Sequence, residues 1–302
     1  MSDDVRKFLI GMGAWAAIFV GVYVLGVLRR RSERLHRRAL RLAAGGPSSA
    51  ELQARMMGLV RPTLLLTPSP NPGFSKLGGR PQLSRDLAWP SGRMQPCVFL
   101  AQIDLSEIPP DAAIEWLPKQ GRLFAFHDTY ALDDPEGVRI LFSTESPGGP
   151  IPQLAETAGS YAERHVSFVS LKSAPSLDWL GLDDSELDLD PKDFRALGEL
   201  VDAPTSDAIQ FRIGGYPNEI QPERMWLSCE HVARGLPEPV WGHEVAADVA
   251  QAAESWRLLL QIDSDPALKM NFGDGGRLYV FIRERHARAG DFSKTVTLWQ
   301  TY

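Results

Sequence analysis

The sequence predicts an α+β domain that is mostly β, is built from two related halves and is preceded by one N-terminal transmembrane helix. Three observations lead to this fold class. Residues 8–28 form an unbroken stretch of 21 uncharged residues. Three short sequence blocks occur twice, in the same order, further along the chain. The 302 residues also include 26 glycines and 23 prolines, and most apolar runs are short, which is typical of strands.

Residues 8–28 are predicted to form the transmembrane helix, behind a short tail at 1–7. A helix needs about 20 apolar residues to cross the core of a bilayer. A cleaved signal peptide is the competing interpretation. Such a peptide has a shorter apolar stretch and then small residues, whereas Arg29, Arg30 and Arg31 follow this stretch at once. We therefore expect an uncleaved anchor.

The flanking positive charges predict the orientation of this helix. Lysine and arginine resist translocation, and only Arg6 and Lys7 precede the apolar stretch. We expect a single-pass protein of the bacterial inner membrane, with its N-terminus outside and its C-terminal domain in the cytoplasm. Seven arginines that follow the stretch are expected to meet the lipid surface or, alternatively, only to set the topology: Arg29, Arg30, Arg31, Arg34, Arg37, Arg38 and Arg41.

Residues 29–47 are predicted to be a basic juxtamembrane helix and a linker. Gly45, Gly46 and Pro47 end this helix. Ser48 and Glu51 then form a capping-box pattern, which favours a new helix. The globular domain is therefore expected to span residues 48–302.

Charge and cysteine content exclude several classes of protein. Residues 1–49 contain nine Lys/Arg against three Asp/Glu, whereas residues 50–302 contain 23 against 35. A domain with an excess of twelve acidic residues repels phosphate backbones, so we expect no nucleic-acid partner. Two cysteines that are 132 positions apart give no disulfide framework and no cysteine-only zinc site.

The repeated blocks divide the domain into two half-repeats, about 63–177 and 205–302, with an acidic connector at 178–204. The distance from the Gly-Gly pair to Gln-Ile-Asp is 24 positions in the first half and 47 in the second. An Ala-rich helix at 245–253 is expected within this insertion. The blocks are GGRP (78–81), FLAQID (99–104) and GRLFAF (121–126) in the first half, and GGYP (214–217), LLLQID (258–263) and GRLYVF (276–281) in the second.

Within the blocks, the apolar runs are predicted to be strands, at 99–105, 123–126, 258–262 and 278–282. Each Gly-Gly pair is followed by proline two positions later, which indicates a tight turn that requires positive φ.

Six longer stretches resemble the YwqG-like family of uncharacterised bacterial proteins over about residues 63–302: SKLGGRPQL, FLAQIDLSEIP, RIGGYPNEIQ, LLLQIDSD, FGDGGRLYVFI and DFSKTVTLWQ. The resemblance implies a duplicated, β-rich fold and no established activity. The N-terminal apolar stretch departs from the family, whose domain usually looks soluble.

The candidate ligand-binding residues come from the repeated blocks. In a strand, Gln102 and Asp104 share one face, as do Gln261 and Asp263. If both pairs met in one cleft, the two carboxylates would bind a cation or act as acid and base. Alternatively, each Gln anchors a Gly-Gly turn and each Asp caps the end of its strand. Arg80, in the first of these turns, is a further candidate.

Other catalytic and cofactor signatures are missing from the sequence. It has no Gly-x-Ser-x-Gly nucleophile motif and no phosphate-binding loop. Cys229, His231 and His243 lack the spacing of a zinc site. We therefore expect no cofactor and no metal.

The sequence favours a membrane-anchored cytoplasmic module that binds an unknown protein or small ligand, with the lipid bilayer as a further partner. One alternative is a hydrolase or metal-assisted enzyme with a carboxylate site between the half-repeats. Another is a binding protein of the toxin-immunity type. The catalytic residues of such an enzyme are unknown from the sequence.

Overall fold

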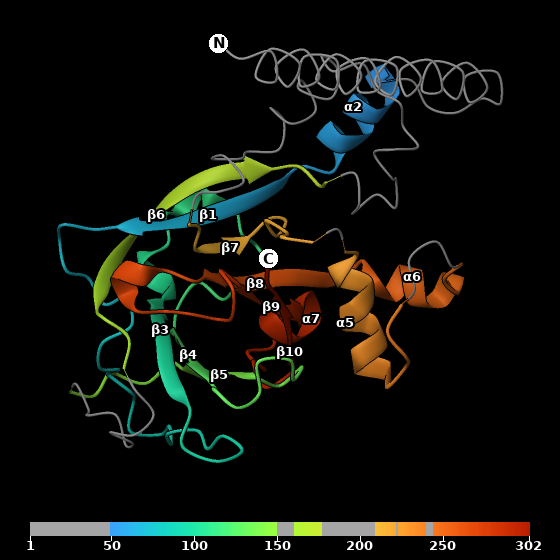
Figure 1. Ribbon diagram of the computed structural model, residues 1–302. Coiled ribbons are helices and arrows are strands. Elements are labelled where there is room, and N and C mark those ends of the chain that lie inside the picture. Colours follow the sequence, from blue (N-terminus) through green and yellow to red (C-terminus); the bar gives the residue numbers. More distant parts are fainter. Residues whose placement is uncertain (1–48, 150–159, 177–208, 222, 240–243) are drawn as a thin grey trace, which may run out of the picture. The chain divides into compact units, whose positions relative to one another are not determined.

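A computed structural model describes residues 49–149, 160–176, 209–221, 223–239 and 244–302 of the chain. The chain divides into two compact units, Met1–Arg55 with Leu182–Leu197, and Met56–Gly181 with Gly198–Tyr302. In the first unit only residues 49–55 are described, and they belong to helix α2 (Ser49–Gly58). The fold given below is that of the second unit (Figure 1).

Ten strands form one antiparallel sheet in the order β10-β9-β8-β7-β1-β6-β2-β3-β4-β5. Their bounds are β1 (Arg61–Pro68), β2 (Lys76–Leu77), β3 (Val98–Asp104), β4 (Arg122–His127), β5 (Val138–Ser143), β6 (Arg164–Ser173), β7 (Arg212–Gly214), β8 (Trp256–Asp263), β9 (Arg277–Arg283) and β10 (Thr295–Gln300).

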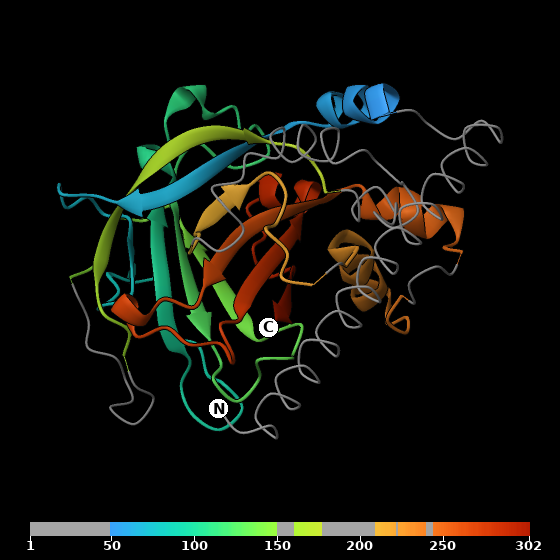
Figure 2. The same ribbon diagram turned by 45° about the horizontal axis from the view of Figure 1, so that its top comes forward.

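The sheet consists of two equivalent sets of five strands, β1–β5 and β6–β10, arranged symmetrically about its middle. Strands β5, β4, β3 and β2 at one end correspond to β10, β9, β8 and β7 at the other, with β6 and β1 in the middle. Strand β1 pairs with β7, and β6 pairs with β2, so the first strand of each set of five completes the sheet of the other set. The two long strands β1 and β6 lie side by side where the sets meet (Figures 1 and 2).

The strand pairs β3–β4 and β8–β9 share the same irregularity. In β3 the pairing with β4 shifts between Phe99 and Ala101, so Leu100 is an extra residue. In β8 the pairing with β9 shifts between Leu258 and Leu260, so Leu259 is an extra residue. A bulge of this kind bends its strand and increases the local twist. The recurring blocks therefore adopt the same backbone geometry in both halves.

The two edge strands approach each other at Thr297. Its N–H donates to the carbonyl of Pro135 at 2.7 Å, and its Oγ1 accepts the N–H of Val138 at 3.2 Å. These bonds satisfy edge groups that would otherwise be open to another chain. The sheet is thus nearly closed into a barrel.

Both faces of strand β4 are buried. Leu123 and Ala125 belong to the largest apolar cluster, whereas Phe124 and Phe126, which alternate with them along β4, belong to a second cluster. On β8 and β9, a third cluster packs Leu258 and other side chains against α5. Burial of each large apolar side chain contributes about 1.5–3 kcal/mol.

Short helices cover parts of the sheet. They are α5 (Met225–Arg234), α6 (Ala247–Ala253), α7 (Glu284–Arg288), and the 3-10 turns η1 (Leu105–Glu107), η2 (Pro110–Ala112) and η4 (Pro266–Leu268). The helix expected at 245–253 is confirmed as α6, and the helix expected to begin at Ser48 is found as α2. The four strands expected in the repeated blocks are confirmed as β3, β4, β8 and β9.

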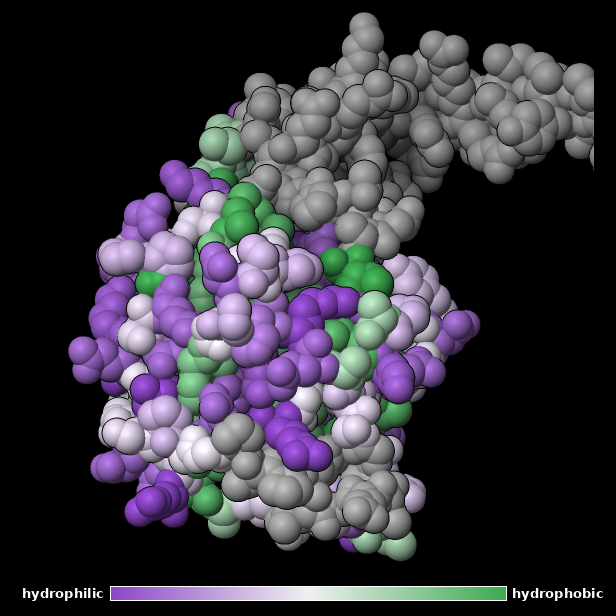
Figure 3. Space-filling model, turned by 90° about the vertical axis from the view of Figure 1, so that its left-hand side faces the viewer, coloured by the Kyte–Doolittle hydropathy of each residue, from purple (hydrophilic) through white to green (hydrophobic). Residues whose placement is uncertain are grey.

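One face of the molecule is shown in space-filling form in Figure 3. Hydrophilic side chains cover most of the described surface there, and hydrophobic ones are scattered among them. The described part of this face therefore presents mainly a polar surface to solvent.

The fold class predicted from the sequence is wrong in its architecture. The described residues form a mostly β, nearly closed sheet of ten antiparallel strands in place of an α+β domain of two adjoining halves. The physical reason is that strand pairing is a long-range property. Local patterns predicted the strands, but they carry no information that β1 pairs with β7 and β6 with β2.

The predicted fold class also included a transmembrane helix, and the structure does not support it. No helix in the described ranges is both long and apolar enough to cross a bilayer. The prediction was based on the hydropathy of residues 8–28 and on the arginines that follow them, and this segment lies outside the described residues. Residues 29–47 with their seven arginines and the whole acidic connector at 178–204 also lie outside, so the membrane location and the domain boundaries stay predictions.

Candidate functional site

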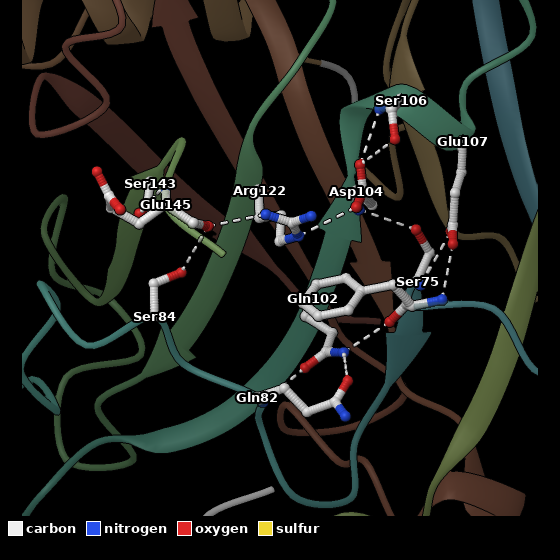
Figure 4. Close-up of polar contacts among 11 residues, drawn as sticks. Ser75, Gln82, Ser84, Gln102, Asp104, Ser106, Glu107, Arg122, Ser143 and Glu145 are labelled. Atoms are coloured by element: carbon white, nitrogen blue, oxygen red, sulfur yellow. Dashed lines mark hydrogen bonds and ion pairs between the residues drawn. The ribbon is translucent and has the colours of Figure 1, made fainter. Parts of the chain in front are cut away.

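Gln102 anchors the first Gly-Gly turn to strand β3 (Figure 4). Its Oε1 accepts the N–H of Gln82 at 3.0 Å, and its Nε2 donates to the carbonyl of Phe74 at 2.6 Å. The side chain is 0% exposed. Buried amide groups of this kind must be hydrogen-bonded, and this one is satisfied by the segments on both sides of the turn. Gln102 therefore holds the turn in place.

The carboxylate of Asp104 has two partners at the end of the same strand (Figure 4). Its Oδ1 accepts the N–H of Ser106 at 2.9 Å and the hydroxyl of Ser106 at 2.6 Å, which caps the 3-10 turn η1. Its Oδ2 forms an ion pair with Nε of Arg122 at 3.1 Å, across the pair of strands β3 and β4. This carboxylate ends its strand in the way a capping aspartate does.

Gln261 and Asp263 make the corresponding contacts in the second half. Oε1 of Gln261 accepts the N–H of Asn218 at 2.9 Å, and its Nε2 donates to Asp263 at 2.9 Å. The other carboxylate oxygen of Asp263 accepts the N–H of Gln210 at 2.8 Å and pairs with Nε of Arg277 at 3.0 Å. Burial raises the pKa of Asp263, although the charge of Arg277 opposes this.

Each Gln/Asp pair therefore contacts the turn and the arginine of its own half. Of the two alternatives for these residues, the contacts favour the structural one, because every carboxylate oxygen has a protein partner. In the second half, Gln261 also donates directly to Asp263, whereas in the first half Gln102 binds Phe74 and Gln82 and Asp104 binds Ser106 and Arg122.

Arg80 lies in the first Gly-Gly turn and is exposed. Its backbone N–H donates to Glu163, which also pairs with Lys76 at 2.7 Å. Burial acts to raise the pKa of Glu163, but the hydrogen bond and the charge of Lys76 lower it overall. Arg80 thus contributes its backbone to this turn, and its guanidinium makes no contact with the described residues.

The interior of the barrel leaves little room for a ligand. A cavity of about 10 Å³ lies among Ala101, Ile103 and other apolar side chains of both halves. This volume is at the lower limit for one water molecule. This cavity is therefore too small for an organic ligand.

A larger cleft opens on the outside of the sheet, between the second half and the loop that joins β4 and β5, and we call it the α7 cleft. Its volume is about 730 Å³, within the range of roughly 300–1,000 Å³ that is usual for small-molecule sites. It lies where α5, α7, β10 and the loop between β4 and β5 meet. Its lining consists of Asp134, Pro135, Glu136, Val232, Ala233, Trp256, Arg283, Arg285, His286, Ser293, Lys294, Thr295 and Val296.

Arg283 is held in this cleft by a buried carboxylate. Its Nη2 forms an ion pair with Glu230 at 2.6 Å, and its guanidinium lies over the ring of Trp256 at 5.1 Å. Glu230 is 1% exposed and also accepts the indole N–H of Trp256 at 2.9 Å. The Nε atom of Arg283 has no hydrogen-bond partner among the described residues. The arginine is thus fixed in position, and not all of its donors are used.

The α7 cleft has an acidic side, Asp134 and Glu136, and a basic side, Arg283, Arg285, His286 and Lys294. The two sides differ in how far their charges are paired. Asp134 pairs with Arg93, and Glu136 pairs with Arg139. Arg285, in contrast, is exposed and forms no ion pair with the described residues; its Nε donates to Nε2 of His286 at 3.3 Å. The acidic side is therefore neutralised by neighbouring arginines, whereas Arg285 is not neutralised.

Lys294 and His286 complete the basic side. Lys294 is exposed and has no carboxylate within ion-pair distance in the described part of the chain. Burial and the charge of Arg285 lower the pKa of His286, so its imidazole is neutral at pH 7. The positive charge of this side thus comes from Arg285 and Lys294, together with the partly neutralised Arg283.

Sequence reasoning missed the α7 cleft completely. None of the five candidate residues lines it. A signal was present, because Arg283–Arg288 reads RERHAR and Lys294 follows. The excess of twelve acidic residues in the domain concealed this local basic cluster.

A family model matches most of the domain. It describes a domain of unknown function, DUF1963, and matches residues 75–301. The chain belongs to this family. No curated protein matches the chain. The matched region of the DUF1963 domain contains both Gln/Asp pairs and all residues of the α7 cleft.

Proposed function

We propose that this DUF1963 protein is a non-catalytic binding domain that holds a small ligand in the α7 cleft. The observation that carries the proposal is the cleft itself. It has the volume of a small-molecule site and a lining in which basic groups without ion-pair partners lie beside a fixed arginine. The finer resemblance of the sequence to the YwqG-like family belongs to this proposal and adds no activity to it.

The polar groups of the cleft support binding in preference to catalysis. The hydroxyl of Ser293 donates to Asp291 at 2.6 Å, while His286 accepts from Arg285. A serine nucleophile needs a histidine within hydrogen-bond distance, and within the described residues these two side chains have other partners. The cleft thus holds donors that suit recognition but lacks an activated nucleophile among its described residues.

The proposed function is tested by thermal shift and by product analysis on the same samples. We expect compounds from a metabolite set to raise the melting temperature of the full chain, and mass spectrometry to show them unchanged after incubation. Val232→Trp places a large side chain in the lining of the cleft, and it should abolish the shifts.

The matched control is Val169→Trp, because Val169 is an exposed valine on β6 that is not among the residues lining the cleft. Ligand shifts that survive in Val232→Trp would contradict the proposed site. Turnover of a bound compound would contradict a non-catalytic role.

A further inference from the structure

We infer that the ligand of the α7 cleft is a small organic anion bearing a carboxylate or phosphate group. It is bound by Arg285 and Lys294, beside Arg283, which is held in place by Glu230. This inference rests on the proposed function and specifies the class of ligand.

The first argument is the balance of partners around the cleft. Both carboxylates in the lining, Asp134 and Glu136, are already paired with arginines from outside the cleft. Arg285 and Lys294 have no ion-pair partner among the described residues. A ligand that enters the cleft therefore meets basic groups that form no ion pair with the described residues and carboxylates that do. Such a surface attracts anions and discriminates against cations.

The second argument is the preorganisation of Arg283. Its side chain is only 15% exposed, and its ion pair with Glu230 fixes it over the Trp256 ring. The ion pair uses Nη2, and Nε is buried and has no partner among the described residues, so the part of the guanidinium left for a ligand is the Nη1 end. An arginine N–H donates a strong, charge-assisted hydrogen bond to a carboxylate or phosphate oxygen. A fixed arginine loses little side-chain entropy when it does so.

The third argument concerns the size of the ligand. The domain carries an excess of twelve acidic residues, so a long anionic polymer is repelled outside the basic side of the cleft. A cleft of about 730 Å³ accommodates a small molecule. The apolar side chains of Val232, Ala233 and Val296 in the lining suit a carbon skeleton attached to the anionic group.

The test is isothermal titration calorimetry of the full chain with citrate, inorganic phosphate and the diamine 1,3-diaminopropane, at constant ionic strength. We expect citrate or phosphate to bind and the diamine not to bind. The citrate and phosphate arms distinguish a carboxylate ligand from a phosphate ligand. The double variant Arg285→Ala/Lys294→Ala should weaken anion binding by about tenfold or more, because two charge-assisted contacts are lost.

The matched control is Arg85→Ala/Lys119→Ala, which removes the same charge from exposed positions outside the cleft. The affinity of this control variant for citrate or phosphate should differ from that of wild type by less than about twofold. Equal losses in the two double variants would overturn the inference, because net charge alone would explain the binding. So would the absence of anion binding. If a neutral or cationic compound then bound and Val232→Trp blocked it, the proposed function would stand and only the ligand class would fail.

Discussion

Asp263 and Arg277 form an ion pair of 3.0 Å across strands β8 and β9, and their side chains are only 4% and 5% exposed. The corresponding pair in the other half, Asp104 and Arg122, has almost the same distance, 3.1 Å, but Arg122 is 21% exposed. The two halves thus use the same contact in different surroundings. Water reaches one pair and is largely excluded from the other, which makes their energetic roles unequal.

We predict that Asp263→Ala destabilises the protein more than Asp104→Ala. The first change takes the carboxylate away from the buried Arg277, which keeps its hydrogen bond to the carbonyl of Asn218, and costs about 3–5 kcal/mol. The second leaves Arg122 access to water and mainly removes the cap of η1, which is worth about 0.5–2 kcal/mol. Urea denaturation of both variants measures the difference. Asp133→Ala, at an exposed position, is the control and should stay within about 0.5 kcal/mol of wild type. Equal losses in the two variants would contradict the prediction.

Removal of the buried glutamines should weaken the Gly-Gly turns. Gln102→Ala and Gln261→Ala each leave a backbone N–H near the turn without its acceptor, at Gln82 and Asn218 respectively. We expect a loss of about 1–3 kcal/mol in the free energy of unfolding for each variant. Gln251→Ala, on the exposed side of α6, should change stability little. A double variant as stable as wild type would show that these residues serve another purpose.

Stability should fall between about pH 6.5 and pH 4 because of His127. Burial lowers the pKa of His127 to about 4, against the opposing charge of Asp128. The unfolded chain binds a proton at this histidine below about pH 6.5, whereas the folded chain binds it only near pH 4. Stability is therefore fully present above this window and is lost as the pH falls through it, by about 3 kcal/mol in total.

The variant His127→Leu tests this pH dependence. In wild type the centroids of the His127 and Phe272 rings are 5.6 Å apart, and both nitrogens of the imidazole lack hydrogen-bond partners among the described residues. The leucine of the variant would therefore pack beside Phe272 without removing a hydrogen bond. We expect the difference in unfolding free energy between pH 7 and pH 4.5 to be smaller in the variant than in wild type. The same pH dependence in both proteins would refute the assignment to His127.

Gly78 should not tolerate a side chain. Its φ is +60°, and a Cβ atom would lie 2.1 Å from the backbone oxygen of Ala162. We expect Gly78→Ala to lower the free energy of unfolding by at least about 2 kcal/mol, from backbone strain and the clash together. Gly58→Ala at the end of α2 meets nothing within 4 Å and should be neutral or slightly stabilising. Thermal melts of both variants decide the point, and similar melting temperatures would contradict it.

The local parts of the fold could be predicted from the sequence. Short apolar runs such as 99–105 and 258–262 predicted strands, and the Gly-Gly pairs predicted positive φ, which Gly78 and Gly214 both show. These features depend on neighbouring residues only. The pairing of β1 with β7 depends on residues about 150 positions apart, and no pattern in either strand specifies it.

The candidate site was likewise predictable from the sequence only in part. The repeat identified Gln102 and Gln261 as important, but the choice between catalysis and anchoring depended on partners such as Gln82 and Asn218, whose positions come from the folded turns. The α7 cleft gathers residues from five separate segments between 134 and 296. Its charge was visible locally in RERHAR, but its shape arises only when the loop between β4 and β5 meets β10.

Hydrogen–deuterium exchange of the full chain, with and without citrate or inorganic phosphate, most directly distinguishes the α7 cleft from the repeated Gln/Asp pairs as the ligand site. Binding in the cleft should slow exchange in peptides from α7 and the segment before β10, residues 284–296, and at the end of α5. Peptides that contain the Gly-Gly turns, at 74–82 and 210–218, should be unchanged. Slower exchange confined to those turns would show that the ligand binds at the Gln/Asp pairs and that the cleft is not the site.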